Sequence, residues 1–262
     1  MIKDLINSLH LEDIQSEEHP SDFIVGDNYT ILVLRLPEMQ ESELKRVSYA
    51  FLVYEEQCYL YERESEKFKK LGSLKDVAKI LDTKIDKLLK IIKDYHYKIE
   101  QLEEELYSDI FDTHFMQKWL SYKKSISLIH RLMFHAFISF ELFLSHHKRK
   151  KSNAFEEIVY TDILEHINRI KDMSQDIVGR LDNLYDFYRA KVDEKMNKNV
   201  YYLTMLSGVF LPLTLITGFF GMNTGGLLWV DDPNGTLKAV ALSFVLEFIF
   251  FLPFYLFSKK RG

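Results

Sequence analysis

The sequence predicts an α+β membrane protein. A small N-terminal cytosolic α/β domain is followed by a long helical stalk that continues into the first of two C-terminal transmembrane helices. Three observations predict this class. Residues 200–262 contain only three of the 39 acids and four of the 34 lysines and arginines. Short alternating runs fill residues 1–72, and a helical spacing of apolar residues begins at Ser73.

Residues 1–72 form the predicted cytosolic α/β layer. The segment Ile2–Ile14 is expected to be helical, and β-rich runs separated by turn signals follow it. Because proline has no backbone N–H, Pro37 is expected to close the first hairpin. The predicted strands are Phe23–Val25, Tyr29–Leu36, Val47–Tyr54, Cys58–Arg63 and Phe68–Leu71.

Residues 73–152 form a predicted cytosolic helical hairpin. The second helix is expected over Trp119–His147, and the basic run His146–Lys151 is expected to break it as a solvated connection. Contact with lipid head groups, or a role in gating, is the alternative for that run. The first helix has apolar residues spaced four and three apart, which is typical of a heptad seam. This seam is Leu81, Ile85, Leu88, Ile92, Tyr95, Ile99, Leu102 and Leu106.

Residues 153–223 form the predicted stalk, a helix that continues into the first span. A second heptad seam runs from Ile163 to Tyr188, and no proline occurs between Asn153 and Pro212. A helix from residue 153 to residue 220 is about 100 Å long at 1.5 Å per residue. A helix of that length needs packing partners, either from the same chain or from copies of it.

Two apolar stretches near the C-terminus are long enough to cross a bilayer. The first covers about 201–220 and carries no charge, and the second, 239–258, has Glu247 as its only charge. Two buried helices of a soluble core are the alternative, which is disfavoured because core helices are rarely apolar on every side.

The positions of lysine and arginine predict the orientation. Basic residues precede the first span and form the tail 259–262, whereas the loop 224–238 contains only Lys238. The loop is therefore expected outside, and both termini in the cytoplasm, for a multi-pass protein of the cytoplasmic (inner) membrane in contact with lipid. Met1–Leu11 does not resemble a signal peptide.

Several classes of function have no support in the sequence. Cys58 is the only cysteine, which excludes an intrachain disulfide and a cysteine-cluster zinc site. The net charge of −5 does not suggest a nucleic-acid partner. No P-loop, HExxH or nucleophile constellation indicates an enzyme. No tightly bound cofactor is expected.

Four segments resemble a known family. The run Phe210–Asn223 (FLPLTLITGFFGMN), at the outer end of the first span, strongly resembles the CorA family of divalent-cation channels. His10–Ile14, Tyr29–Pro37 and Tyr160–His166 are similar to the family's cytosolic domain. The resemblance implies a homopentamer with five first spans around a pore. It also implies transport of Mg²⁺, with Co²⁺ as a further substrate, driven by the membrane potential and gated by cytosolic cation.

Two features depart from the family pattern. The α/β layer looks trimmed, and Thr224-Gly225-Gly226 stands where the magnesium branch commonly has an acidic stretch. The two glycines are more similar to the zinc-transporting ZntB branch, whereas that branch often replaces the methionine that this chain keeps as Met222. The alternatives to a Mg²⁺ channel are a Zn²⁺ transporter coupled to protons and a non-conducting membrane scaffold or sensor.

The resemblance assigns the ion filter to Gly221, Met222 and Asn223. Five Asn223 amide oxygens, with nearby carbonyls, can hold a cation that keeps its waters. Mg²⁺ prefers oxygen ligands and dehydrates reluctantly, so a neutral amide ring suits it. The alternative is that Asn223 only caps the helix.

The resemblance also assigns pore-lining positions, with Thr214 offering a ring of hydroxyl groups. The apolar members can close the pore by dewetting. The alternative is that they only pack between helices. The positions are Thr214, Leu211, Leu203 and Val200, with Asn197 just below them.

Asp162 and His166 lie at i and i+4 on one helix face. The resemblance places this face at a subunit boundary, where a carboxylate can bind the transported ion and hold the closed state. The histidine suits Zn²⁺ better than Mg²⁺. The alternative is an ordinary solvated face.

Glu247 is the only acidic or basic residue inside either span, which makes it a functional candidate. The resemblance assigns it no role. Three interpretations remain: a neutral acid hydrogen-bonded to another helix, a proton-binding site for coupled transport, and polarity without a function.

Overall fold

The structure is a computed structural model of the 262-residue chain. It describes residues 3–16, 19–41, 43–108, 114–150, 155–222, 226, 228–229 and 231–259. These fall into two compact units, residues 1–186 and residues 187–262.

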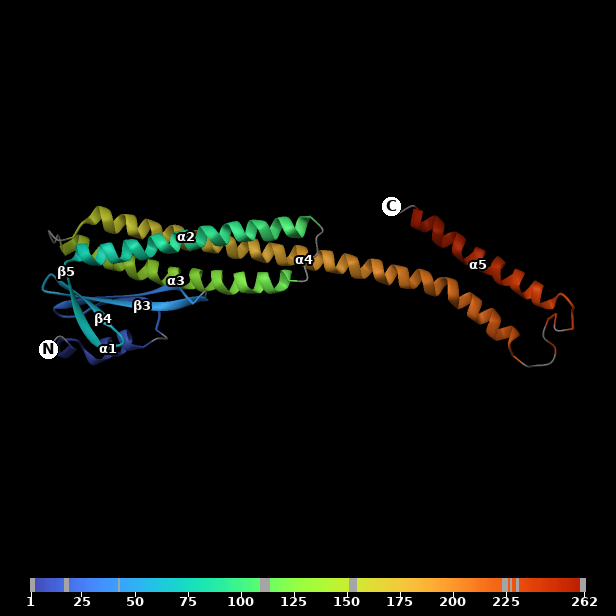
Figure 1. The fold of residues 1–262 in the computed structure, drawn as a ribbon, viewed down its shortest axis with the longest axis horizontal. Coiled ribbons are helices and arrows are strands. Elements are labelled where there is room, and N and C mark those ends of the chain that lie inside the picture. Colours follow the sequence, from blue (N-terminus) through green and yellow to red (C-terminus); the bar gives the residue numbers. More distant parts are fainter. Residues whose placement is uncertain are drawn as a thin grey trace. The chain divides into compact units, whose positions relative to one another are not determined.

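The first unit contains a five-stranded antiparallel sheet in which neighbouring strands in sequence are neighbours in space. Figure 1 shows the sheet between α1 on one side and long helices on the other. The second strand is buried along most of its length, since it is covered on both faces. The elements are α1 (Ser8–Gln15), β1 (Asp22–Val25), β2 (Tyr29–Gln40), β3 (Glu43–Tyr54), β4 (Gln57–Glu62) and β5 (Lys67–Gly72).

The expectation that Pro37 ends the second strand is wrong, because β2 continues to Gln40. The backbone N–H of Arg35 donates to Ser21 Oγ on the β1 side of the strand. Alternate residues of a strand point their N–H groups to the same side, so the nitrogen of Pro37 also points there. The register of β1 with β2 ends at Val33, and proline therefore removes no ladder hydrogen bond. As a result β3 begins at Glu43 and not at Val47.

One further expectation for this layer needs correction. A 3₁₀ turn at Lys3–Leu5 precedes α1, which starts at Ser8, so Ile2–Ile14 is not one helix. The side chain of Asn7 accepts a hydrogen bond from the N–H of Leu9 at 3.0 Å and caps the helix there.

Three long helices pack on one another, and α2 and α3 also pack on the sheet. They are α2 (Leu74–Tyr107), α3 (Phe115–Lys150) and α4 (Glu157–Phe220), which has 64 residues. On α2 the seam residues are buried apart from Tyr95, and on α4 the seam is buried from Ile163 to Leu184. Trp119 of α3 donates to the Leu181 carbonyl of α4 at 2.7 Å. The first part of the long helix therefore finds its packing partners within the same chain.

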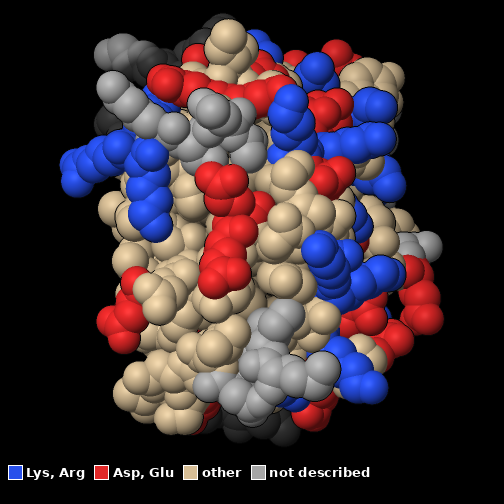
Figure 2. All heavy atoms as spheres, turned by 90° about the vertical axis from the view of Figure 1, so that its left-hand side faces the viewer, with Lys and Arg blue, Asp and Glu red and all other residues tan. Residues whose placement is uncertain are grey.

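The basic run does not break the helix where expected, because α3 continues to Lys150. Cations in the last turn are favoured by the helix dipole, and Lys148 also pairs with Glu157 of α4 at 2.9 Å. Nearby, Lys75 pairs with Glu156 at 2.6 Å. Figure 2 shows this end of the first unit, where lysines and arginines are interspersed with acids. The run is thus part of a surface of mixed charge.

Helix α4 begins later than predicted, at Glu157 and not at residue 153, which lies outside the described residues. Its first turn is held by Tyr160, whose hydroxyl donates to the Leu74 carbonyl at 2.7 Å. Aromatic rings of Phe140, Phe143 and Phe155 surround this side chain. Burial raises the pKa of Tyr160, so the hydroxyl remains a donor at neutral pH.

The second unit contains the end of α4 and helix α5 (Gly235–Lys259). Among the described residues, α3 and α4 are long and apolar enough to cross a membrane. The apolar window of α3 is 44% buried within the fold, whereas that of α4 is 6% buried. The α3 window is therefore accounted for by core packing. Helix α4 contains the predicted span 201–220, and packing within the fold does not account for its apolar window.

Replacing Tyr160 with phenylalanine is expected to lower the free energy of unfolding by about 1 kcal/mol, because a buried hydrogen bond is lost without loss of volume. Thermal melting followed by circular dichroism measures this change. The control is Tyr97→Phe, since Tyr97 is 59% exposed and its hydroxyl lies at the surface. Equal melting temperatures for the two variants would contradict the role given to the Tyr160 hydroxyl.

Candidate functional site

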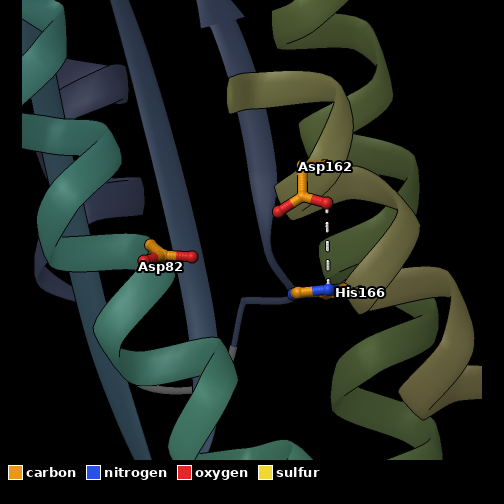
Figure 3. A group of neighbouring side chains, drawn as sticks. All are labelled: Asp82, Asp162 and His166. Carbon is orange, nitrogen blue, oxygen red and sulfur yellow. Dashed lines mark ion pairs between the residues drawn. The ribbon is translucent and has the colours of Figure 1, made fainter. Parts of the chain in front are cut away.

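Asp82, Asp162 and His166 form a group of possible metal ligands at the edge between α2 and α4. One ligand atom from each residue lies within 4.8 Å of the other two. Figure 3 shows Asp162 and His166 projecting from α4 towards Asp82 on α2. Two carboxylates and one imidazole can bind a dication, and the imidazole suits a transition metal better than Mg²⁺.

The heptad seams of α2 and α4 determine where these polar side chains lie. Asp82 follows buried Leu81 on α2, and Asp162 precedes buried Ile163 on α4. A residue next to a seam position lies at the margin of the packed face, half in solvent. The side chains of Asp162 and His166 are accordingly 58% and 28% exposed.

His166 lies between two carboxylates. Its Nε2 is 3.9 Å from Asp162 Oδ1, and its Nδ1 is 3.8 Å from Asp86 Oδ1 on α2. Both distances are too long for direct hydrogen bonds, and the buried Nδ1 has no hydrogen-bond partner among the described residues. The site thus offers ligand atoms that are close together but not hydrogen-bonded to one another.

The sequence predicted two members of this group, Asp162 and His166, and missed the third, Asp82. The structure also adds Asp86 of α2, whose carboxylate faces His166. A signal existed in the sequence, because Asp82 and Asp86 are four residues apart and flank the heptad seam. The heptad pattern alone did not fix which acids of α2 lie opposite His166.

Of the predicted filter, Gly221 and Met222 follow the last residue of α4. The Gly221 N–H donates to the Thr217 carbonyl at 2.8 Å, which continues the helical bonding by one residue. A Cβ on Gly221 would lie 2.9 Å from that same carbonyl oxygen, so a larger residue fits poorly. Asn223 lies outside the described residues.

The predicted pore-lining residues share one face of α4, since their spacing keeps them within about a third of a helical turn. All are exposed in the single chain, and Leu211 is the most exposed of the three apolar ones at 74%. Ile216, on the opposite face, is 9% exposed and lines a pocket with residues of α5. The hydroxyl of Thr214 donates to the Phe210 carbonyl at 2.7 Å. The residues on this face are Asn197, Val200, Leu203, Leu211 and Thr214.

The pocket has a volume of about 460 Å³ and lies between the end of α4 and the start of α5. Phe220 stacks on Trp229 with an interplanar angle of 7°, and Lys238 pairs with Asp232 at its rim. Trp229 has a φ of 67°, in the left-handed region, where the chain turns back towards α5.

Glu247 lies on α5 and is half-buried. It is one helical turn beyond Ser243, which is buried and lines the pocket. Glu247 therefore shares the face of α5 that contributes to the pocket.

Comparison with known proteins finds related sequences whose names refer to different metal ions. The cobalt/magnesium transport protein CorA of Thermotoga maritima is 22% identical over 83% of this chain and 66% of its own length. The divalent cation transporter CmaX of Pseudomonas aeruginosa is 36% identical over 24% of this chain and 19% of its own. The zinc transport protein ZntB of Pectobacterium atrosepticum is 43% identical over 22% of this chain and 18% of its own. The chain thus matches less than two thirds of each relative's length.

Solved structures share the fold. The CorA magnesium transporter of Methanocaldococcus jannaschii superposes with a TM-score of 0.75 at 19% identity, covering 97% of this chain and 84% of the other. Full-length CmaX superposes with a TM-score of 0.70 at 16% identity, covering 98% and 82%. The family profile described as "CorA-like Mg2+ transporter protein" matches residues 4–260. Because that match covers nearly the whole chain, the protein belongs to the CorA-like Mg²⁺ transporter family.

Proposed function

We propose that the chain is one subunit of a divalent-cation channel that moves Mg²⁺, with Co²⁺ as a further substrate, across the cytoplasmic membrane. The observation that carries this proposal is the continuity of α4. The same helix bears Asp162 and His166 near its start and the predicted pore face near its end. An ion bound at Asp162 and His166 therefore acts on the same helix that lines the proposed pore.

A homopentamer is the proposed assembly. In support, the predicted pore face and the preceding stretch of α4 remain uncovered in one chain, with Val192, Met196 and Val200 all exposed. Large exposed apolar faces mark interaction sites, and copies of the same helix around an axis cover them symmetrically. Both termini are placed in the cytoplasm by the distribution of lysine and arginine.

The membrane potential supplies the proposed driving force. One elementary charge gains about 2.3 kcal/mol per 100 mV, so a dication gains about 4.6 kcal/mol when the inside is negative. Asn223, with Gly221 and Met222, forms the proposed filter at the outer mouth. Below it, apolar rings formed by Leu211, Leu203 and Val200 open the pore when water fills them and close it by dewetting.

Regulation is proposed at Asp82, Asp162 and His166. When cytosolic cation is abundant, the ion bridges α2 and α4 and favours the closed state by mass action. Loss of the ion leaves Asp82, Asp86 and Asp162 facing one another, and their repulsion favours separation of the helices.

A Zn²⁺ transporter coupled to protons is the second candidate. It is favoured by the imidazole of His166 among the regulatory ligands and by the half-buried Glu247 on α5. A non-conducting scaffold or sensor is the third candidate, and it predicts no ion flux at all.

Purified protein in liposomes is expected to take up Mg²⁺ when an inside-negative potential is imposed, and Asn223→Ala is expected to abolish this uptake while the protein stays folded. The amide is an ion contact and not part of a core. Asn234→Ala, which changes an exposed asparagine of the same loop, is the control. If the Asn223→Ala variant takes up Mg²⁺ at the wild-type rate, the filter assignment is refuted. Strong competition by Zn²⁺ favours the second candidate, and no flux in wild type favours the third.

Asp162→Ala is expected to weaken inhibition by internal Mg²⁺ roughly tenfold, because one carboxylate ligand is lost from the regulatory site. The measurement is uptake against internal Mg²⁺ concentration in the same liposomes. Asp176→Ala is the matched control, since Asp176 is an exposed acid of α4 two heptads further on. An unchanged inhibition curve for Asp162→Ala would remove the regulatory role.

Glu247→Gln is expected to retain assembly and uptake, and Glu247→Leu to weaken the oligomer, because an amide still donates a hydrogen bond to a facing helix and leucine does not. Size-exclusion chromatography and uptake measure the two effects. The proton-coupling interpretation instead requires that Glu247→Gln lose the dependence of flux on a pH gradient. Wild-type flux that ignores the gradient excludes coupling, and full assembly of Glu247→Leu excludes the hydrogen-bonded acid.

A further inference from the structure

The pocket between the end of α4 and the start of α5 has mainly apolar walls, although hydroxyl groups line it. The Thr217 hydroxyl donates to the Leu213 carbonyl of α4 at 2.9 Å. On α5 the Ser243 hydroxyl donates to the Ala239 carbonyl, also at 2.9 Å. A hydroxyl has one proton to donate, and both of these protons are already bonded within their own helix. An occupant of the pocket therefore meets carbon atoms more than free hydrogen-bond donors.

The pocket has a buried floor and an exposed mouth. Ile216 and Ser243 line it and are 9% and 7% exposed, which places them at the floor. Leu228 and Val240 line it as well and are 67% and 49% exposed, so the pocket opens to the surface beside them. Its volume of about 460 Å³ lies within the range of about 300–1,000 Å³ that is usual for small-molecule sites. An apolar chain therefore has both access to the pocket and room in it.

The surface around the mouth indicates where the occupant comes from. Leu237 and Phe244 lie one helical turn to either side of Val240 and are 73% and 64% exposed, so this face of α5 is apolar. Ile216 at the floor lies on the face of α4 opposite the predicted pore face. Copies of the chain that meet around the pore cover the pore face and leave the mouth to the surrounding lipid. The occupant is therefore a lipid and not a second copy.

Charged groups at the rim favour one kind of head group. Asp232 lines the pocket and pairs with Lys238, and the two side chains are 28% and 48% exposed. An exposed ion pair contributes little to stability, so its partners are exchanged easily. The loop 224–238 is negative overall, because Asp231 and Asp232 outnumber Lys238. A head group with a primary ammonium and a phosphate matches this rim, since the ammonium donates to Asp232 and the phosphate accepts from Lys238.

We propose that the pocket binds an acyl chain of an outer-leaflet phosphatidylethanolamine, whose head group contacts Asp232 and Lys238. The negative loop disfavours an anionic head group such as phosphatidylglycerol. A choline head group has no N–H group to donate to the carboxylate. Because lipid tails are as apolar as the pocket wall, the acyl chain provides fit and the head group provides selectivity. The proposal rests on the proposed membrane placement of α4 and α5, and it does not depend on ion flux.

The fluorescence of Trp229, which lines the pocket, tests the proposal. The chain has two tryptophans, so Trp119→Phe leaves Trp229 as the only one. The full chain in this background is placed in phosphatidylcholine vesicles with increasing fractions of a lipid whose brominated acyl chains quench tryptophan on contact. We expect half-maximal quenching at a roughly threefold lower fraction for phosphatidylethanolamine than for phosphatidylglycerol or phosphatidylcholine, because exposed ionic contacts give a small preference.

Two alanines of α5 provide a matched pair of variants. Ala239→Leu adds bulk inside the pocket and is expected to weaken quenching. Ala241→Leu adds the same bulk at an exposed position and is expected to leave quenching unchanged. Asp232→Asn is expected to remove the preference for ethanolamine over choline.

Three results overturn the proposal. Equal quenching by the three brominated lipids, or equal quenching of the Ala239→Leu and Ala241→Leu variants, indicates only the general lipid surface around the spans. Absence of quenching by any of the lipids indicates that a second copy covers the pocket.

Circular dichroism establishes that each variant is folded. If Trp119→Phe fails to fold, native mass spectrometry of the chain with both tryptophans identifies the lipids that it retains. The expected result is then a preference for phosphatidylethanolamine that Ala239→Leu removes and Ala241→Leu keeps. Both methods measure lipid binding, so a chain without ion flux still tests this site separately from the proposed function.

Discussion

The burial of the apolar seams along α2 and α4 is the constraint on which the other features of the first unit depend. A fully buried leucine or isoleucine contributes about 1.5–3 kcal/mol, whereas an exposed ion pair contributes about 0–1 kcal/mol. The seams therefore set which helices lie together and in what register. The charged residues beside them need not hold the helices together, and this leaves them available to bind ions.

The sequence was sufficient to predict the seams, because each heptad depends only on residues close together in the chain. The same is true of most strands in the sheet. The extension of β2 through Pro37 was not predictable from local sequence, since it depends on β1 having already ended on that side. The basic last turn of α3 likewise has a partner that is distant information for that helix, since Lys148 pairs with Glu157 of α4.

The candidate site shows the same division between local and distant information. Asp162 and His166 were predictable because they lie four residues apart within Tyr160–His166, a segment that resembles the family's cytosolic domain. Asp82 belongs to a helix 80 residues earlier, and only the register between the two helices shows that its carboxylate reaches the same place. In the second unit, spacing was sufficient to show that the predicted pore residues share a face, and the structure adds that the opposite face meets the pocket beside α5.

The heptad spacing on α4 has a mechanical consequence. From Ile163 to Leu184 the seam repeats over three heptads. A straight α-helix drifts by about 20° per heptad relative to such a repeat, or about 60° over this length, and a sustained seven-residue repeat takes up this drift by left-handed supercoiling. Gentle coiling of α4 around its neighbours in the first unit is therefore expected, and it keeps one apolar face buried over all three heptads.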